Sequence, residues 1–267
     1  MTYFHSIILG IVEALTEFLP VSSTGHLILA SHFLGLENSD FTKAFEVVIQ
    51  GGTVLAVIFY YRKSLINKVQ KFFKGNQNSK QFFINVFVAF LPSAFVGLLF
   101  HKKIKEFLFG PLPVVGALIV GGLAMILVEK FLKNKKSSKN LESMSFSDAL
   151  CVGLYQCLSL WPGTSRAMTT LLGARLRGLN TEASAEFSFM LAIPTLLAAT
   201  LWDLRKMGPE LFNDSEKMKL LALGSLVSFV FALLVIHWFL GFVKRNSLEI
   251  FGWYRILVGI ILAYFLL

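Results

Sequence analysis

The sequence predicts an all-α integral membrane protein, with six transmembrane helices and two re-entrant helical hairpins arranged as an inverted repeat. Three observations lead to this fold class. The 267 residues are 55% hydrophobic and only 15% charged, whereas soluble domains carry about 25% charged residues. Six apolar segments approach the roughly 20 residues that cross a bilayer. Two motif-bearing segments, 4–36 and 147–178, resemble each other, and each is interrupted halfway.

The six predicted spans form two groups of three. They cover residues 45–61, 82–100, 113–132, 187–202, 219–243 and 254–267. The polar linkers between them, such as 62–81, are too short to form a further domain, so we predict a single membrane domain over residues 1–267. Arg255 stands at the start of the last span, where arginine is typical of an interfacial anchor. Contact with a functional site is the alternative for this residue.

Two short stretches indicate an internal duplication. GIVEALTEFLPVSS (10–23) aligns with GLYQCLSLWPGTS (153–165). The matched pairs are Gly10 with Gly153, Glu13 with Gln156 and, after one deletion, Ser23 with Ser165. Because the offset stays nearly constant along the alignment, it favours a repeat over a chance match. Repeat one is expected at about 4–132 and repeat two at about 147–267.

Each repeat begins with an apolar run that proline and hydroxyl residues break in the middle. Neither part of the run is long enough to cross a membrane alone. Irregular backbone at membrane depth is tolerated only where protein or a cavity satisfies it, which predicts re-entrant hairpins. Each repeat then has three spans, an odd number, so the second repeat must be inverted relative to the first. Inverted repeats with broken helices around a central site are a recurring membrane architecture.

Lysine and arginine are distributed unequally between the two sides of this topology. The richer side gathers 62–81, 133–139, Arg175, Arg177, Lys244 and Arg245, and the poorer side Lys43, 102–105 and 205–219. The positive-inside rule places the richer side in the cytoplasm, so the first hairpin opens outward. This topology accounts for the net charge of +9. Because no basic aromatic module is present, we predict a lipid bilayer as partner and no nucleic acid.

Two glutamates stand in the first hairpin. Glu13 and Glu17 are four residues apart, so a helix presents them on one face. Two like charges in an apolar run repel each other and lose hydration, so a cation or a shared proton is expected nearby. A carboxylate pair without a role in a wet crevice is the alternative, but ionisable groups at membrane depth are functional by default.

Hydroxyl residues follow the proline of each hairpin, where a new helix is expected to begin. Ser22, Ser23, Thr24 and His26 form the first set, and Thr164, Ser165 and Arg166 the second. Free amides and hydroxyls at a helix start bind anions, and the planar fork of arginine matches phosphate oxygens. If the tips of the two hairpins meet, these groups and the glutamates suit a phosphate carried on a lipid.

Two assignments of the nucleophile remain open. His26 follows Ser23 by three residues, which permits a serine–histidine pair with a glutamate that orients the imidazole. In the other assignment His26 itself attacks phosphorus, and the hydroxyl only donates hydrogen bonds.

These motifs resemble those of the undecaprenyl-diphosphate phosphatases, the bacitracin-resistance family. Glu13-Ala-Leu-Thr-Glu17 is similar to the acidic E/Q-x-x-x-E motif of that family, which Pro20-Val-Ser-Ser-Thr-Gly-His26 continues, and Pro162-Gly-Thr-Ser-Arg166 is similar to its second motif. The resemblance implies a phosphoric anhydride hydrolase of the bacterial inner membrane. Such an enzyme removes the terminal phosphate of undecaprenyl diphosphate and regenerates the carrier lipid for peptidoglycan synthesis.

The resemblance also implies roles for individual residues. The catalytic set would be Glu13, Glu17, Ser23 and His26, and the phosphate-binding set Ser22, Thr24, Thr164, Ser165 and Arg166. Glu13 and Glu17 would alternatively hold a divalent ion, Mg²⁺ or Ca²⁺. The site would face the outer side, the enzyme would form a homodimer, and excess enzyme would confer bacitracin resistance.

The sequence departs from the family pattern at one place, and one rival function fits the same architecture. Ala167-Met168 replaces the Ser-Gly that usually follows the second motif, so one hydroxyl and one glycine are missing near the phosphate. A transporter or flippase of the phosphorylated carrier lipid is the rival function, because inverted repeats are common in transporters.

Overall fold

The computed structural model describes residues 1–37, 39–108, 110–133, 139–207 and 214–266. Apart from one isolated bridge between Lys139 and Leu179, regular secondary structure in this part of the chain is helical. The helices are α1 (Tyr3–Glu17), α2 (Ser23–Phe33), α3 (Asp40–Tyr60), α4 (Arg62–Phe73), α5 (Gln77–Leu108), α6 (Pro111–Leu132), α7 (Phe146–Cys157), η1 (Leu158–Leu160), α8 (Arg166–Leu176), α9 (Thr181–Met207), α11 (Ser215–Val243) and α12 (Glu249–Leu266).

Five helices in the described ranges are long and apolar enough to cross a membrane: α3, α5, α6, α9 and α11. This supports the prediction of a multi-pass membrane protein. α12 corresponds to the sixth predicted span but is not among the five. The count of six spans and two re-entrant hairpins therefore stays a prediction.

The predicted linker 62–81 is itself largely helical. α4 fills residues Arg62–Phe73, and α5 already begins at Gln77. None of the residues of α4 is buried. Basic residues alternate there with exposed apolar side chains such as Ile66 and Phe73, at the spacing of an amphipathic helix. The high charge density masked this periodicity in the sequence.

Both motif-bearing segments are pairs of short helices joined by a break. α1 and α2 are separated by residues 18–22, and α7 and α8 by η1 and residues 161–165. Ser22 and Ser165 are the N-caps of α2 and α8, with φ of 76° and 73°. They are the only described residues other than glycine with positive φ. This conformation is strained for serine and is typical of functional sites.

This shared conformation corrects the predicted alignment by one residue. The structural counterpart of Ser165 is Ser22 rather than Ser23, because both are caps with the same backbone conformation. Ser23 then corresponds to Arg166, and each is the first residue of its helix. The deletion introduced to align the prolines caused the error.

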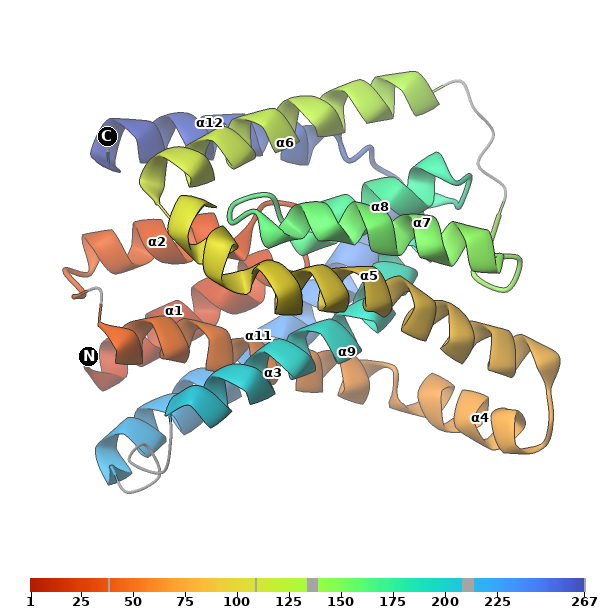
Figure 1. Cartoon of the computed structure of the whole chain (residues 1–267), viewed down its shortest axis with the longest axis horizontal. Helices are drawn as coiled ribbons and strands as arrows, with labels where there is room; N and C mark the ends of the chain where they lie inside the picture. The colour runs from red at the N-terminus through yellow and green to blue at the C-terminus, as the bar shows by residue number, and fades with distance from the viewer. Residues whose placement is uncertain (38, 109, 134–138, 208–213, 267) are drawn as a thin grey trace.

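The main helix contacts join the two halves of the chain. α1 lies on α11, α7 on α5, α6 on α12, and α3 on α9. Figure 1 shows α6 and α12 side by side, with both chain termini at one end of the molecule and α4 at the other. Gly10 allows close approach to α11, since a Cβ there would lie 2.7 Å from Gly224 O. Gly153 does the same for α5, where a Cβ would lie 2.5 Å from Ala89 O.

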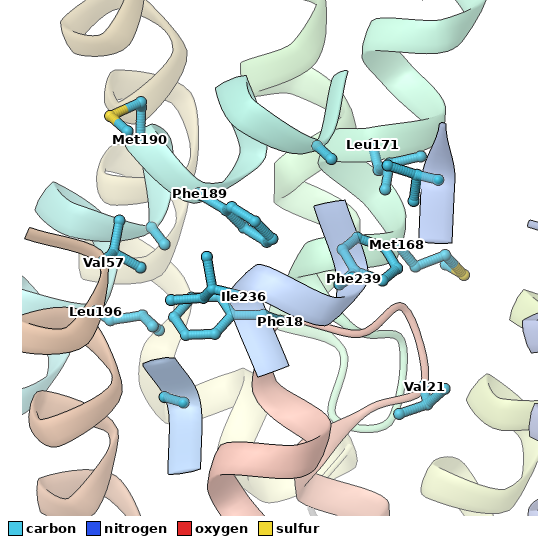
Figure 2. Close-up of a cluster of buried hydrophobic side chains, with 14 of the residues drawn as sticks. Phe18, Val21, Val57, Met168, Leu171, Phe189, Met190, Leu196, Ile236 and Phe239 are labelled. Carbon is cyan, nitrogen blue, oxygen red and sulfur yellow. The ribbon is translucent and has the colours of Figure 1, made fainter. Parts of the chain in front are cut away.

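One apolar cluster lies where the two helix pairs meet. Figure 2 shows Phe18 and Val21 from the first break, Met168 and Leu171 from α8, Phe189 from α9, and Ile236 and Phe239 from α11. Phe18 and Phe189 meet edge to face, with ring centroids 5.1 Å apart. The cluster excludes water from one side of the polar residues described next.

Candidate functional site

Glu17 is the centre of a buried polar site. Its Oε1 accepts a hydrogen bond from Arg166 Nη2 at 3.0 Å, and its Oε2 accepts one from Ser23 Oγ at 2.6 Å. The side chains of Glu17 and Arg166 are 6% and 7% exposed. A hydroxyl-to-carboxylate hydrogen bond this short is charge-assisted. One carboxylate therefore joins the last residue of α1 to the first residues of α2 and α8.

Arg166 is oriented by α9 as well as by Glu17. Its Nη1 donates to Ser188 O at 2.8 Å and lies 3.4 Å from Ser188 Oγ. Thr170 Oγ1 is 2.7 Å from the same Ser188 hydroxyl. Arg166 Nε is buried and has no partner among the described residues, so one donor remains available. Sequence reasoning missed Ser188 and Thr170, because neither lies in a recognisable motif.

Glu13 differs sharply from its counterpart in the second half. Glu13 is fully buried beside the carboxyl group of Glu17, and neither of its oxygens accepts a hydrogen bond from a donor in the described part of the chain. Gln156 is also fully buried, but its amide donates to Ser93 Oγ and accepts from Thr195 Oγ1. An unpaired carboxylate is expensive to bury. Glu13 therefore needs a proton or a cation that the protein itself does not supply.

The carboxylates fit a divalent ion only in part. No group of three or more His, Cys, Asp or Glu side chains that could hold a metal occurs among the described residues. Mg²⁺ is commonly bound by one or two carboxylates, with substrate phosphates and water completing its shell. The free oxygens of Glu13 fit that pattern, and those of Glu17 are already engaged by Arg166 and Ser23.

His26 is held by Ser22 and Tyr254 rather than by Ser23. Its Nδ1 lies 2.7 Å from Ser22 O, and its Nε2 lies 2.8 Å from Tyr254 Oη. The two rings stack, with centroids 5.5 Å apart and planes 6° apart. Since a carbonyl only accepts, Nδ1 carries the proton and Nε2 accepts from the tyrosine hydroxyl. The predicted pair of Ser23 with His26 is thus replaced by a pair of Ser23 with Glu17.

The remaining predicted phosphate-binding residues lie in or next to the breaks. Ser22 Oγ accepts from Gly25 N at 3.4 Å, and Ser165 Oγ accepts from Met168 N at 3.2 Å. Thr24 and Thr164 are partly buried, and their hydroxyls have no hydrogen bond to another described side chain or carbonyl. The starts of α2 and α8 lie close together, because their first residues share Glu17.

Arg255 belongs to this site, which was the alternative to an interfacial anchor. It is fully buried, so the prediction of an interfacial anchor was wrong. Its guanidinium donates to Pro20 O, Gly163 O and Ala117 O at 3.3, 2.9 and 3.0 Å. The error came from the helix boundary, because α12 begins at Glu249 and Arg255 lies almost two turns inside it. An arginine within an apolar run was the available signal.

Comparison with known proteins places these features in a family. The family model described as bacitracin resistance protein BacA matches residues 6–261. A protein of Sorangium cellulosum named undecaprenyl-diphosphatase is 50% identical over 97% of this chain and 85% of its own length. A protein of Acinetobacter baylyi named undecaprenyl-diphosphatase 3 is 44% identical over 99% and 98%. An undecaprenyl-diphosphatase of Aquifex aeolicus is 42% identical over the full length of both chains.

Proposed function

This chain belongs to the bacitracin resistance protein BacA family, and from that membership we propose that it is an undecaprenyl-diphosphate phosphatase. It hydrolyses the terminal phosphate of the lipid diphosphate and returns the monophosphate carrier to peptidoglycan synthesis. The names of its relatives support this substrate. The single observation that carries the chemistry is the buried carboxylate of Glu17, which holds both the Ser23 hydroxyl and the Arg166 guanidinium.

Ser23 is the nucleophile in the proposed reaction, and Glu17 is its base. Ser23 Oγ attacks the terminal phosphorus while its proton passes to Glu17, which a hydrogen bond of 2.6 Å already prepares. The bond between that phosphorus and the bridging oxygen breaks, and the prenyl monophosphate leaves with the bridging oxygen and the proton. Charge on the transferring phosphoryl group is stabilised by Arg166 and by the amides at the two helix starts.

Water completes the turnover. It attacks the phosphoserine and gives a proton to Glu17, and the bond between phosphorus and Ser23 Oγ breaks. Glu17 passes the proton to Ser23 Oγ, so that inorganic phosphate is released and both residues return to their starting states. His26 is held with its Nε2 toward Tyr254, which favours a role in binding or orienting the substrate over the role of nucleophile.

Glu13 is the proposed ligand of a divalent cation, Mg²⁺ or Ca²⁺, whereas Glu17, the second predicted ligand, has both oxygens engaged by Arg166 and Ser23. When bound, such an ion neutralises charge on the diphosphate. The unpaired, buried oxygens of Glu13 support this role. In the second half the corresponding residue is the neutral Gln156, whose amide is hydrogen-bonded to Ser93 and Thr195. This supports a single ion rather than a symmetric pair.

We further propose the topology of six spans and two re-entrant hairpins, with inverted repeats at about 4–132 and 147–267. The enzyme lies in the bacterial inner membrane, and its site faces the outer side. The matched caps Ser22 and Ser165 and the matched close contacts of Gly10 and Gly153 support a duplication. The homodimer stays a prediction.

Transport of the phosphorylated carrier lipid is the second candidate function, and the matched breaks in the two halves favour it. Purified protein in detergent separates the two. Phosphatase action predicts release of inorganic phosphate from undecaprenyl diphosphate by the wild type, and loss of release in Ser23→Ala. Binding of the lipid without any release, under conditions that include Mg²⁺ or Ca²⁺, would leave transport as the function.

A further inference from the structure

We propose that two neighbouring residues of α12, Tyr254 and Arg255, are positioning residues of the active site. Arg255 ties the two interhelical breaks to each other, and Tyr254 fixes the ring of His26. The inference deepens the proposed phosphatase function and rests on it. It extends the site beyond the two motifs to a third element near the end of the chain.

Arg255 joins backbone from both halves of the molecule. One amino group donates to Pro20 O in the first break, and the other donates to Gly163 O in the second break and to Ala117 O in α6. Pro20 precedes Ser23 by three residues, and Gly163 precedes Arg166 by three. A shift of either carbonyl therefore displaces the nucleophile relative to the phosphate-binding arginine.

No acidic partner explains the burial of this arginine. Arg255 is fully buried, and no carboxylate in the described part of the chain forms an ion pair with it. An apolar side chain in such a place would avoid the loss of hydration. The guanidinium is nonetheless suited to this position, because its planar fork can bridge several fixed carbonyls at once. A role in fixing the two breaks accounts for its presence.

The surrounding backbone leaves room for the guanidinium. A Cβ at Gly121 of α6 would overlap Arg255 Nη2 and lie 3.0 Å from its Cζ. Gly163, whose carbonyl accepts from Arg255, has φ of 92°, a conformation that favours glycine. Glycine at both positions thus permits contacts that a larger residue would prevent.

Tyr254 holds His26, another functional side chain of the first hairpin. Its hydroxyl lies 2.8 Å from His26 Nε2, and its ring stacks on the imidazole. Because Ser22 O holds the other ring nitrogen, the imidazole is fixed in one tautomer and one orientation. The adjacent residues Tyr254 and Arg255 therefore set the geometry of His26 and of both breaks.

The test compares Arg255→Lys with Arg245→Lys, a matched change at an exposed position near the end of α11. Lysine keeps the charge but lacks the fork. We expect kcat of Arg255→Lys for undecaprenyl diphosphate to fall about 10- to 100-fold, because misplaced reacting groups lose rate steeply. KM is expected to rise about 3- to 10-fold, as Arg166 is displaced from the phosphate. Both constants are measured in one detergent, well below the melting temperature.

The rise in KM separates positioning from a merely structural role, since partial unfolding lowers the apparent kcat and leaves KM unchanged. Tyr254→Phe, which removes only the hydroxyl, is expected to lower kcat about 3- to 10-fold, whereas the exposed Tyr264→Phe leaves it unchanged. Folded Arg255→Lys with kcat and KM within twofold of the wild type overturns the role of Arg255, and an unaffected Tyr254→Phe overturns that of Tyr254.

A second variant covers the case in which Arg255→Lys does not fold. Gly121→Ala keeps the arginine but displaces its guanidinium, so the same changes in kcat and KM are expected. Wild-type constants in Gly121→Ala would then overturn the inference. An inactive wild type would instead contradict the proposed function, so the two failures are distinguishable.

Discussion

Glu17 and Arg166 are 149 positions apart in the sequence, yet their side chains are joined by a buried hydrogen bond of 3.0 Å. This pair connects the end of α1 to the start of α8, and so connects the two halves of the chain. A buried ion pair adds little stability relative to apolar residues, but loss of one partner leaves an uncompensated charge. The pair therefore allows stability and activity to be separated by experiment.

Arg166→Gln alone is expected to lower the free energy of unfolding by about 3 kcal/mol, because it leaves Glu17 charged and buried. The double variant Glu17→Gln/Arg166→Gln removes both charges, and its melting temperature is expected to recover toward that of the wild type. Phosphate release is expected to stay abolished in both. Recovery of activity together with stability would show that the pair is structural only.

The nucleophile can be identified by trapping. Ser23→Ala is expected to lose phosphate release by a factor of about 10³ or more, as the loss of a nucleophile does elsewhere. His26→Asn is expected to lose about 10-fold to 100-fold, because it orients rather than attacks. After reaction with substrate radiolabelled in its terminal phosphate, quenching with a denaturing detergent at neutral pH should leave acid-stable phosphate on the wild type and on His26→Asn, but no label on Ser23→Ala. Radiolabelled phosphate on a histidine of Ser23→Ala would instead identify His26 as the nucleophile.

Chelation tests the role of Glu13. Removal of divalent ions with EDTA is expected to abolish phosphate release, and Mg²⁺ or Ca²⁺ to restore it. Glu13→Gln is expected to require about 10- to 100-fold more of the ion for half-maximal activity, as changes at metal sites commonly do. Glu37→Gln, at an exposed position after α2, is the control. An unchanged ion requirement in Glu13→Gln would show that its carboxylate is not a ligand.

The folded protein is expected to lose stability in acid because of Asp148, at the start of α7. Burial raises the pKa of this carboxyl group, but hydrogen bonds from Lys139, Ser145 and Arg177 outweigh that effect and lower the pKa to about 2. Because the pKa is lower in the folded protein, the stabilisation is present above about pH 4 and is lost as the pH falls toward 2.

Asp148→Asn removes this dependence. At neutral pH the variant is expected to be less stable than the wild type by about 2 kcal/mol, and the difference should shrink between pH 4 and pH 2. Melting of the two proteins in detergent across this range provides the measurement. A difference that stays constant with pH would contradict the role of the ionised carboxylate.

Because α7 packs closely on α5, a single methyl group added at Gly153 is expected to destabilise the protein. A Cβ at Gly153 would lie 2.5 Å from Ala89 O and 2.9 Å from Ala89 Cα, both backbone atoms that cannot rotate away. Gly153→Ala is therefore expected to lower the free energy of unfolding by about 1–3 kcal/mol. Gly116→Ala, where nothing lies within 4 Å of the added atom, is the control. Equal melting temperatures for the two variants would contradict the close approach of α7 to α5.

The meeting of the first acidic motif with Arg166 was predictable from the repeat, because inverted broken helices bring their tips together. The partner of Ser23 was not predictable. Helical spacing suggested His26, but the imidazole is occupied by Ser22 O and by Tyr254 from a distant helix. The alignment of the two caps was wrong by one residue, because no sequence pattern marks a serine with positive φ. Arg255 was misplaced by an error in a helix boundary, the least reliable part of such predictions.

Helices of one half of the chain pack against helices of the other half, and this has a consequence for biosynthesis. Ser6 of α1 donates to Leu220 O of α11, 214 positions further along the chain. A nascent polypeptide thus emerges from the ribosome with its first helix lacking the surface on which that helix finally rests. The acidic hairpin can settle only after nearly the whole chain has been translated, so neither half is expected to mature as an independent fragment.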